Sequence, residues 1–319
     1  MKKILSAGLR ITISFGLLGL LFWLMRDRFG KIGSALIDSD IRFIIAALIS
    51  FMVCVMFLAM RLKVIFYGEN IFMKYLDSVQ LTYIGYFFNN FMPTAVGGDI
   101  PKALYAAQAH GAKMKSYISV MMDRIIGLYS FLILAAIALV VGRGRFNIPG
   151  ITQLVFVFLT CGVIGFIVIT NTKIARLVEK ILSKFKVMNL GKKLHEVYTV
   201  VHDYRNRKDI VVKSILISVV AQSFYFLMVY MFLRSLGGDV GIINVFLIMP
   251  VVSFISMIPS IGGLGVREGA IVTFFAALVG KEIAFAGSLL VMLGFFYISF
   301  IGGIVFFFWS IRMGRKERV

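Results

Sequence analysis

Apolar residues dominate the chain in long runs that charged segments separate. About 20 helical residues cross a hydrocarbon core roughly 30 Å thick, so runs of this length predict transmembrane helices. Six runs qualify: residues 7–25, 42–60, 117–141, 151–170, 212–233 and 283–311. The first run follows Lys2 and Lys3 as a signal peptide would, but it is long and lacks a small-residue cleavage pattern, so we expect a retained helix. The pattern predicts an all-α polytopic membrane helix bundle.

Two further stretches do not fit the pattern of full spans. Residues 75–112 and 242–279 each hold two shorter apolar segments that proline and glycine interrupt. Irregular backbone at membrane depth costs several kcal/mol per unpaired group unless protein or a water-filled cavity satisfies it, so such breaks indicate a site. We expect a re-entrant helical hairpin at each stretch, with these break residues: Pro93, Gly97, Gly98, Pro259, Gly262, Gly263 and Gly265.

The distribution of basic residues predicts the topology. Residues 171–213 carry eleven Lys and Arg against four Asp and Glu, which predicts a cytoplasmic segment. The N-terminus and the basic tail at 312–319 should also be cytoplasmic, which holds if each hairpin leaves on the side it entered. The two hairpins then form an inverted pair. The predicted external loop opposes this topology, because it carries Arg26, Arg28, Lys31 and Arg42 with only three aspartates as offset.

We therefore expect a single integral membrane domain over residues 1–319. Its first half would be 1–170, and its second half 212–311. The basic segment 171–211 between them has apolar residues at helical spacing, including Tyr204. Two interpretations stay open: amphipathic helices lying along the inner membrane surface, or a cytosolic helical hairpin packed against the bundle.

Composition supports a membrane location. The chain is 60% hydrophobic and 15% charged, whereas soluble domains are about 25% charged. A net charge of +19 would suggest nucleic acid in a soluble protein, but most Lys and Arg flank the apolar spans. Inner-leaflet orientation and anionic head groups explain that distribution better, so we expect a cytoplasmic-membrane protein with no nucleic-acid partner.

Ionisable residues inside spans are rare, and they are candidates for function by default. Three cations could form a pocket for phosphate, and three carboxylates could be counter-charges, ligands for an amine, or a proton-coupling group. These candidates are Asp99, Lys102, Asp123, Arg124, Arg267 and Glu268. Structural roles are the alternatives: Asp99 as a helix N-cap, Arg267 and Glu268 as a staple of the loop, and Asp123 and Arg124 at head-group level.

No metal site and no cofactor are expected from the sequence. His195 and His202 lie seven residues apart on one predicted helical face, without a third ligand in view. The chain also shows no nucleotide-binding loop and no nucleophile beside a base. These patterns argue against a catalytic domain.

Three motifs in order resemble the lysylphosphatidylglycerol synthase transmembrane-region family. They run from Asn90 to Lys102, over Asp123-Arg124, and from Pro259 to Gly269, and the similarity covers nearly the whole chain. The family includes the flippase half of the multiple peptide resistance factor and relatives linked to hopanoid or polyprenol-linked glycolipid handling. The resemblance implies lipid translocation without the separate soluble aminoacyl transferase domain. Lys102 stands where many relatives should have Arg, so it keeps the charge but not the bidentate fork.

Three functional hypotheses follow. The first is a flippase that moves an anionic phospholipid or lipid-linked molecule between leaflets of the cytoplasmic membrane. The second is a lipid-modifying transferase with a carboxylate such as Asp99 or Glu268 as general base. The third is a scaffold that docks a lipid-modifying enzyme through the basic segment. Membrane lipids are the expected partners, and a homodimer and an enzyme partner both stay open.

Overall fold

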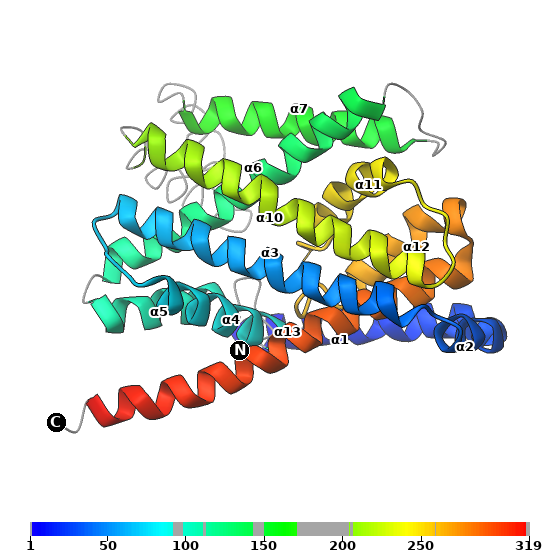
Figure 1. The fold of residues 1–319 in the computed structure, drawn as a ribbon, viewed down its shortest axis with the longest axis horizontal. Helices are drawn as coiled ribbons and strands as arrows, with labels where there is room; N and C mark the ends of the chain where they lie inside the picture. The colour runs from blue at the N-terminus through cyan, green and yellow to red at the C-terminus, as the bar shows by residue number, and fades with distance from the viewer. Residues whose placement is uncertain are drawn as a thin grey trace.

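The computed structural model describes residues 2–91, 98–110, 113–142, 150–170, 204, 207–258 and 260–316. Within these residues the regular structure is helical (Figure 1). The elements are α1 (Lys2–Met25), the short 3₁₀ helix η1 (Arg26–Arg28), α2 (Phe29–Ile37), α3 (Ile41–Gly68), α4 (Tyr75–Phe91), α5 (Asp99–His110), α6 (Lys113–Gly142), α7 (Ile151–Thr170), α10 (Lys208–Ser235), α11 (Ile242–Ile255), α12 (Val266–Val279) and α13 (Lys281–Lys316).

Four of these helices are long and apolar enough to cross a membrane: α3, α6, α10 and α13. They confirm the apolar spans predicted at 42–60, 117–141, 212–233 and 283–311. The predicted runs 7–25 and 151–170 fall within α1 and α7, and their crossing of the membrane stays a prediction. One boundary was wrong, because α3 continues past residue 60 to Gly68 and so includes Arg61.

Each of the stretches 75–112 and 242–279 contains two shorter helices with a break between them, as the sequence predicts. In the first stretch α4 and α5 contact each other, and in the second α11 and α12 do so. Gly98 lies in the first break, while Pro93 and Gly97 lie outside the described residues, as does Pro259 in the second. The side of the membrane from which each helix pair enters stays a prediction.

The contacts between helices repeat when the two halves of the chain are exchanged. If α3, α4, α5 and α6 are matched to α10, α11, α12 and α13, then α4 packing on α13 matches α11 packing on α6. The contacts α5–α6 and α12–α13 match in the same way, as do α3–α4 and α10–α11. Helices α3 and α10 lie side by side and run in opposite directions (Figure 1). This arrangement is the one expected of an inverted pair of repeats.

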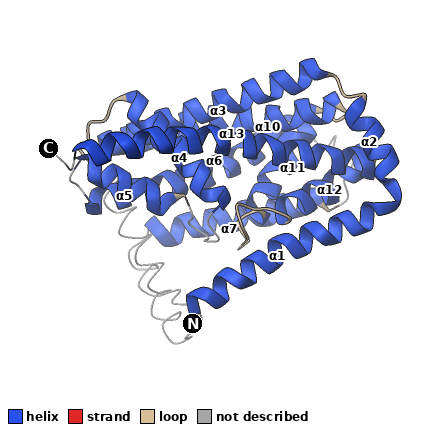
Figure 2. Ribbon diagram, turned by 90° about the horizontal axis from the view of Figure 1, so that it is seen from below, coloured by secondary structure: helices blue, strands red, loops and turns tan. Residues whose placement is uncertain are grey.

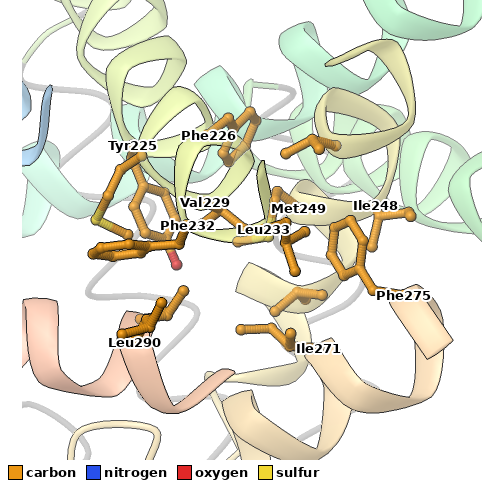
Figure 3. Packing of buried hydrophobic residues seen from close by; sticks show 14 of the residues in the cluster. Tyr225, Phe226, Val229, Phe232, Leu233, Ile248, Met249, Ile271, Phe275 and Leu290 are labelled. Atoms are coloured by element: carbon orange, nitrogen blue, oxygen red, sulfur yellow. The ribbon is translucent and has the colours of Figure 1, made fainter. Parts of the chain in front are cut away.

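The largest apolar core of the described residues takes most of its side chains from the second half of the chain and the rest from the first half, including Phe51 and Leu134. Side chains of α10, α11, α12 and α13 meet there, among them the buried Phe232, Ile248 and Phe275 (Figure 3). Lipid tails are as apolar as these side chains, so close van der Waals packing rather than removal from water holds such helices together. This packing fixes α11 and α12, the two helices that flank the second break.

Helix α1 lies along one edge of the bundle (Figure 2) and contacts α12. The buried Ser14 hydroxyl accepts a hydrogen bond from the Ile261 N–H at 2.8 Å. A Cβ on Gly265 would lie 2.6 Å from the Ser14 carbonyl oxygen, so the second break and α1 are in backbone contact. The first helix thus satisfies part of the irregular backbone that the second break exposes.

Most of the basic segment predicted at 171–211 lies outside the described residues. Its end is described, and Tyr204 there is buried and donates a hydrogen bond to the Ile65 carbonyl at 3.0 Å. Burial raises the pKa of the Tyr204 hydroxyl, which therefore stays protonated as a donor. Arg207 pairs with the buried Glu69 at 3.1 Å. This end of the segment packs against α3. Both interpretations of the segment stay open, because residues 171–203 lie outside the described residues.

The close contact of α4 with α13 depends on a glycine. A Cβ at Gly302 would lie 2.2 Å from the Tyr83 carbonyl oxygen, and backbone cannot rotate away as a side chain can. We expect Gly302→Ala to separate the two helices and to lower the free energy of unfolding by about 1–3 kcal/mol. Thermal unfolding in detergent micelles measures the change.

Gly294→Ala in the same helix is the matched control, since its nearest neighbour would be the Phe232 ring at 3.4 Å. Equal melting temperatures for the two variants would contradict the close-packing argument.

Candidate functional site

The first break leads directly into a charged helical turn. Gly98 ends the break, and Asp99 and Lys102 occupy the first turn of α5. A Cβ on Gly98 would lie 2.0 Å from the Gly85 carbonyl oxygen, so only glycine lets α5 begin this close to α4. The Lys102 side chain passes over Gly85, where a Cβ would lie 3.0 Å from its Cε. The two glycines therefore hold Lys102 inside the bundle.

Asp123 of α6 lies at the centre of a buried ion network. Its Oδ1 accepts a hydrogen bond from Arg61 Nε at 2.7 Å, and its Oδ2 lies 3.6 Å from Lys102 Nζ. All three side chains are buried, with 7%, 7% and 11% of the Asp123, Arg61 and Lys102 side chains exposed. Two buried cations thus share a single carboxylate. The depth of Asp123 in the membrane stays a prediction.

Asp99 forms a second ion pair, with Arg124. Asp99 is the first residue of α5, and its carboxylate reaches across to Arg124 of α6. The Arg124 side chain is 38% exposed, whereas the Asp123 network next to it in sequence is buried. The structure therefore brings four of the six predicted residues together at the junction of α5 and α6.

The other two predicted residues form their own pair at the start of α12. Arg267 Nη2 donates to Glu268 Oε1 at 2.8 Å, and the Gly265 N–H donates to Glu268 Oε2 at 2.6 Å. The Arg267 guanidinium lies 3.9 Å from the centre of the Phe295 ring. Glu268 thus caps α12 and neutralises Arg267 at once, which supports the alternative that this pair staples the loop.

The glycines of the second break adopt backbone conformations that other residues rarely adopt. The φ angles of Gly262, Gly263 and Gly265 are 56°, 81° and 79°. A Cβ on Gly262 would also lie 2.7 Å from Asn90 Oδ1, so the second break fits directly against the end of α4.

Asn90, near the end of α4, connects this helix to the second half of the chain. Its side-chain amide donates to Ser299 Oγ at 2.6 Å and to the Phe295 carbonyl at 3.2 Å. Phe295 is the residue that lies under Arg267. The structure thus places α4 and the second break in contact. A single cationic pocket shared by Lys102, Arg124 and Arg267 stays a prediction.

Arg61 is the charged residue that sequence analysis missed. It was placed just outside a span that ended at residue 60, whereas α3 continues for eight more residues. The signal was present in the sequence, because Arg61 is followed by Leu62, Ile65 and Phe66 at helical spacing. Within the described residues no group of three or more His, Cys, Asp or Glu could hold a metal ion, and His195 and His202 lie outside them.

The sequence model of the lysylphosphatidylglycerol synthase transmembrane region matches residues 7–303. The chain belongs to this family. It is also similar to the UPF0104 membrane protein PH1989 of Pyrococcus horikoshii, with 27% identity over 96% of each chain. Its family membership and apolar helices make it a multi-pass membrane protein, as the motifs at both breaks imply.

Proposed function

We propose that this protein is a lipid flippase that moves a lipid with an anionic head group between the leaflets of the cytoplasmic membrane. The observation that carries the proposal is the incomplete pairing of Lys102. It shares the carboxylate of Asp123 with Arg61, and its Nζ lies 3.6 Å from that carboxylate. A charge-assisted hydrogen bond is normally 2.7–2.9 Å long, so Lys102 has unused capacity to bind an anion.

A phosphate-bearing head group fits this capacity. Charged side chains are costly inside a bilayer and mark the path of a substrate or ion. A phosphate next to Lys102 would complete the pairing of this cation, whose Nζ lies 3.6 Å from the Asp123 carboxylate. Arg124 is the more exposed cation of the group. It would meet the head group first and exchange the carboxylate of Asp99 for the lipid phosphate.

The second pair has a different role in this proposal. Arg267 is already neutralised by Glu268, and both side chains are buried, with 4% and 1% exposed. We assign them to holding the shape of the second break, so that this break can support the end of α4. We assign contact with the substrate to Lys102 of α5 and Arg124 of α6.

An apolar groove of about 520 Å³ between α4 and α13 supports a lipid as the substrate. Phe87 and Phe91 line it from α4, and Phe296, Phe300 and Phe307 line it from α13. Phe91 is the last residue of α4 before the first break. An acyl chain in this groove would therefore run past the break that leads to Lys102.

Flippase activity can be tested in liposomes with fluorescently labelled phosphatidylglycerol, an anionic lipid, and phosphatidylcholine, a zwitterionic one. We expect wild-type protein to move phosphatidylglycerol between leaflets and Lys102→Gln to slow this by at least about tenfold, as the loss of a hydrogen bond to a charged group implies. Access of the label to an external quencher reports the movement.

Lys63→Gln is the matched control, because Lys63 is an exposed lysine of α3 outside the ion network. Equal lipid movement in empty liposomes, wild type and Lys102→Gln would defeat the proposal. Chemical conversion of the labelled lipid, detected by mass spectrometry, would indicate a lipid-modifying enzyme instead.

A further inference from the structure

Arg61 belongs to the buried ion network, but a lipid bound at Lys102 would not need to contact it. It lies on α3, whereas the proposed head-group residues lie on α5 and α6. Its Nε donates to Asp123 of α6 at 2.7 Å, and its Nη1 donates to Ser218 of α10 at 2.7 Å. One guanidinium thus connects α3 to two other helices.

The surroundings of Arg61 hold the guanidinium in one place. Gly127 lies one turn after Asp123 on α6, and a Cβ there would lie 3.2 Å from Arg61 Nη1. Ser218 in turn donates to Ser130 of α6 at 2.9 Å. Gly127 leaves space for the guanidinium on one side, and the hydrogen-bonded hydroxyls of Ser218 and Ser130 hold it on the other.

We propose that Arg61 is the positioning residue of the head-group site. It holds Asp123 on its own side, so that Lys102 keeps only a loose contact with this carboxylate and can exchange it for an anionic group. This inference rests on the proposed role of Lys102, and it adds a residue that does not touch the lipid.

Two cations, Arg61 and Lys102, compete for the carboxylate of Asp123. Arg61 contacts Asp123 at 2.7 Å and Lys102 contacts it at 3.6 Å, so Arg61 is the stronger partner in the structure. Without the charge of Arg61, Asp123 would pair fully with Lys102 and neutralise it. Without both Arg61 and Asp123, Lys102 would lose its competing carboxylate and bind an anion more tightly.

Two variants should therefore change lipid preference in opposite directions. The measured quantity is the affinity for short-chain phosphatidylglycerol divided by that for short-chain phosphatidylcholine, obtained by calorimetric titration in detergent. We expect Arg61→Gln to lower this ratio about tenfold, which corresponds to one hydrogen bond to a charged group. We expect the double variant Arg61→Gln/Asp123→Asn to raise the ratio above the wild-type value.

The double variant removes the charges of both Arg61 and Asp123, so neither of these is left as an unpaired buried charge. The net charge of the three-residue network stays at +1, as in the wild type, and is carried by Lys102. Arg61→Lys tests the role of the charge, since a lysine keeps the positive charge although it cannot bond Asp123 and Ser218 in the same forked manner. We expect it to restore most of the phosphatidylglycerol preference that Arg61→Gln loses. Arg42→Gln is the matched arginine control, because Arg42 is exposed at the other end of α3.

The outcomes separate this inference from the proposed function. If the wild type moves phosphatidylglycerol but Arg61→Gln keeps the wild-type affinity ratio, the positioning role is overturned and the flippase proposal stands. An affinity ratio that changes as expected, in a protein that moves no lipid in liposomes, would uphold the positioning role and overturn the flippase. Equal loss of both affinities in Arg61→Gln, unrelieved in the double variant, would indicate a structural role only and overturn the inference.

Discussion

Replacement of Asp123 by alanine is expected to lower the free energy of unfolding by about 3–5 kcal/mol, the cost of leaving a buried charge without its partner. Asp123 is the shared carboxylate of Arg61 and Lys102, and all three side chains are buried. Its removal would leave two cations facing each other in a medium that screens their repulsion poorly. Thermal unfolding in detergent micelles, calibrated against chemical denaturation, measures the loss.

Asp239→Ala provides the contrast for this prediction. Asp239 pairs with Arg234 at 2.7 Å, a distance like that of Asp123 to Arg61, but its side chain is 95% exposed. Exposed pairs contribute about 0–1 kcal/mol, so this variant should remain close to wild type. A loss of similar size in both variants would show that burial of the Asp123 network has no energetic consequence.

Replacement of Glu268 by alanine is expected to lower the free energy of unfolding by a similar amount, for two reasons that act together. Glu268 is fully buried, and its two carboxylate oxygens serve different partners, Arg267 and the Gly265 N–H. Removal would leave the buried guanidinium of Arg267 unpaired and the start of α12 uncapped. We expect a decrease of about 3–5 kcal/mol in the free energy of unfolding, measured in the same way.

Glu268→Gln separates the two contributions, because an amide oxygen can still accept from the Gly265 N–H while the negative charge is lost. Its stability should lie between those of wild type and Glu268→Ala. Glu282→Ala is the surface control, since Glu282 also lies in the first turn of a helix and pairs with an arginine, Arg28, but at the exposed start of α13. If Glu268→Ala proves as stable as Glu282→Ala, the second break does not depend on this internal pair.

The two breaks thus use charge differently. At the second break one carboxylate neutralises one guanidinium within the same helical turn. At the first break the charges come from α3, α5 and α6, and one carboxylate serves two cations. A locally neutral pair can maintain a loop, whereas an incompletely paired group across three helices is suited to bind and release an anion. This difference is why the proposed head-group site lies at the first break.

Hydropathy predicted the helical elements well because a long apolar helix needs no tertiary partner to be specified in a membrane. The positions of Pro and Gly predicted the two interruptions for a similar reason, since glycine at positive φ and proline act through local backbone geometry. The end of α3 was missed because an arginine was taken as the end of the span, although its charge is neutralised inside the bundle by Asp123.

The sequence by itself determined the family, the apolar spans, the two breaks and the candidate ionisable residues. Only the tertiary structure decided how these residues pair: Arg124 with Asp99, Arg267 with its neighbour Glu268, and Arg61 with Asp123. Span length and backbone breaks follow from neighbouring residues along the chain, whereas an ion pair can join side chains far apart in sequence, as Arg61 and Asp123 are by 62 positions. Helix packing brings such charges together, because a charge buried without a partner would be too costly to keep.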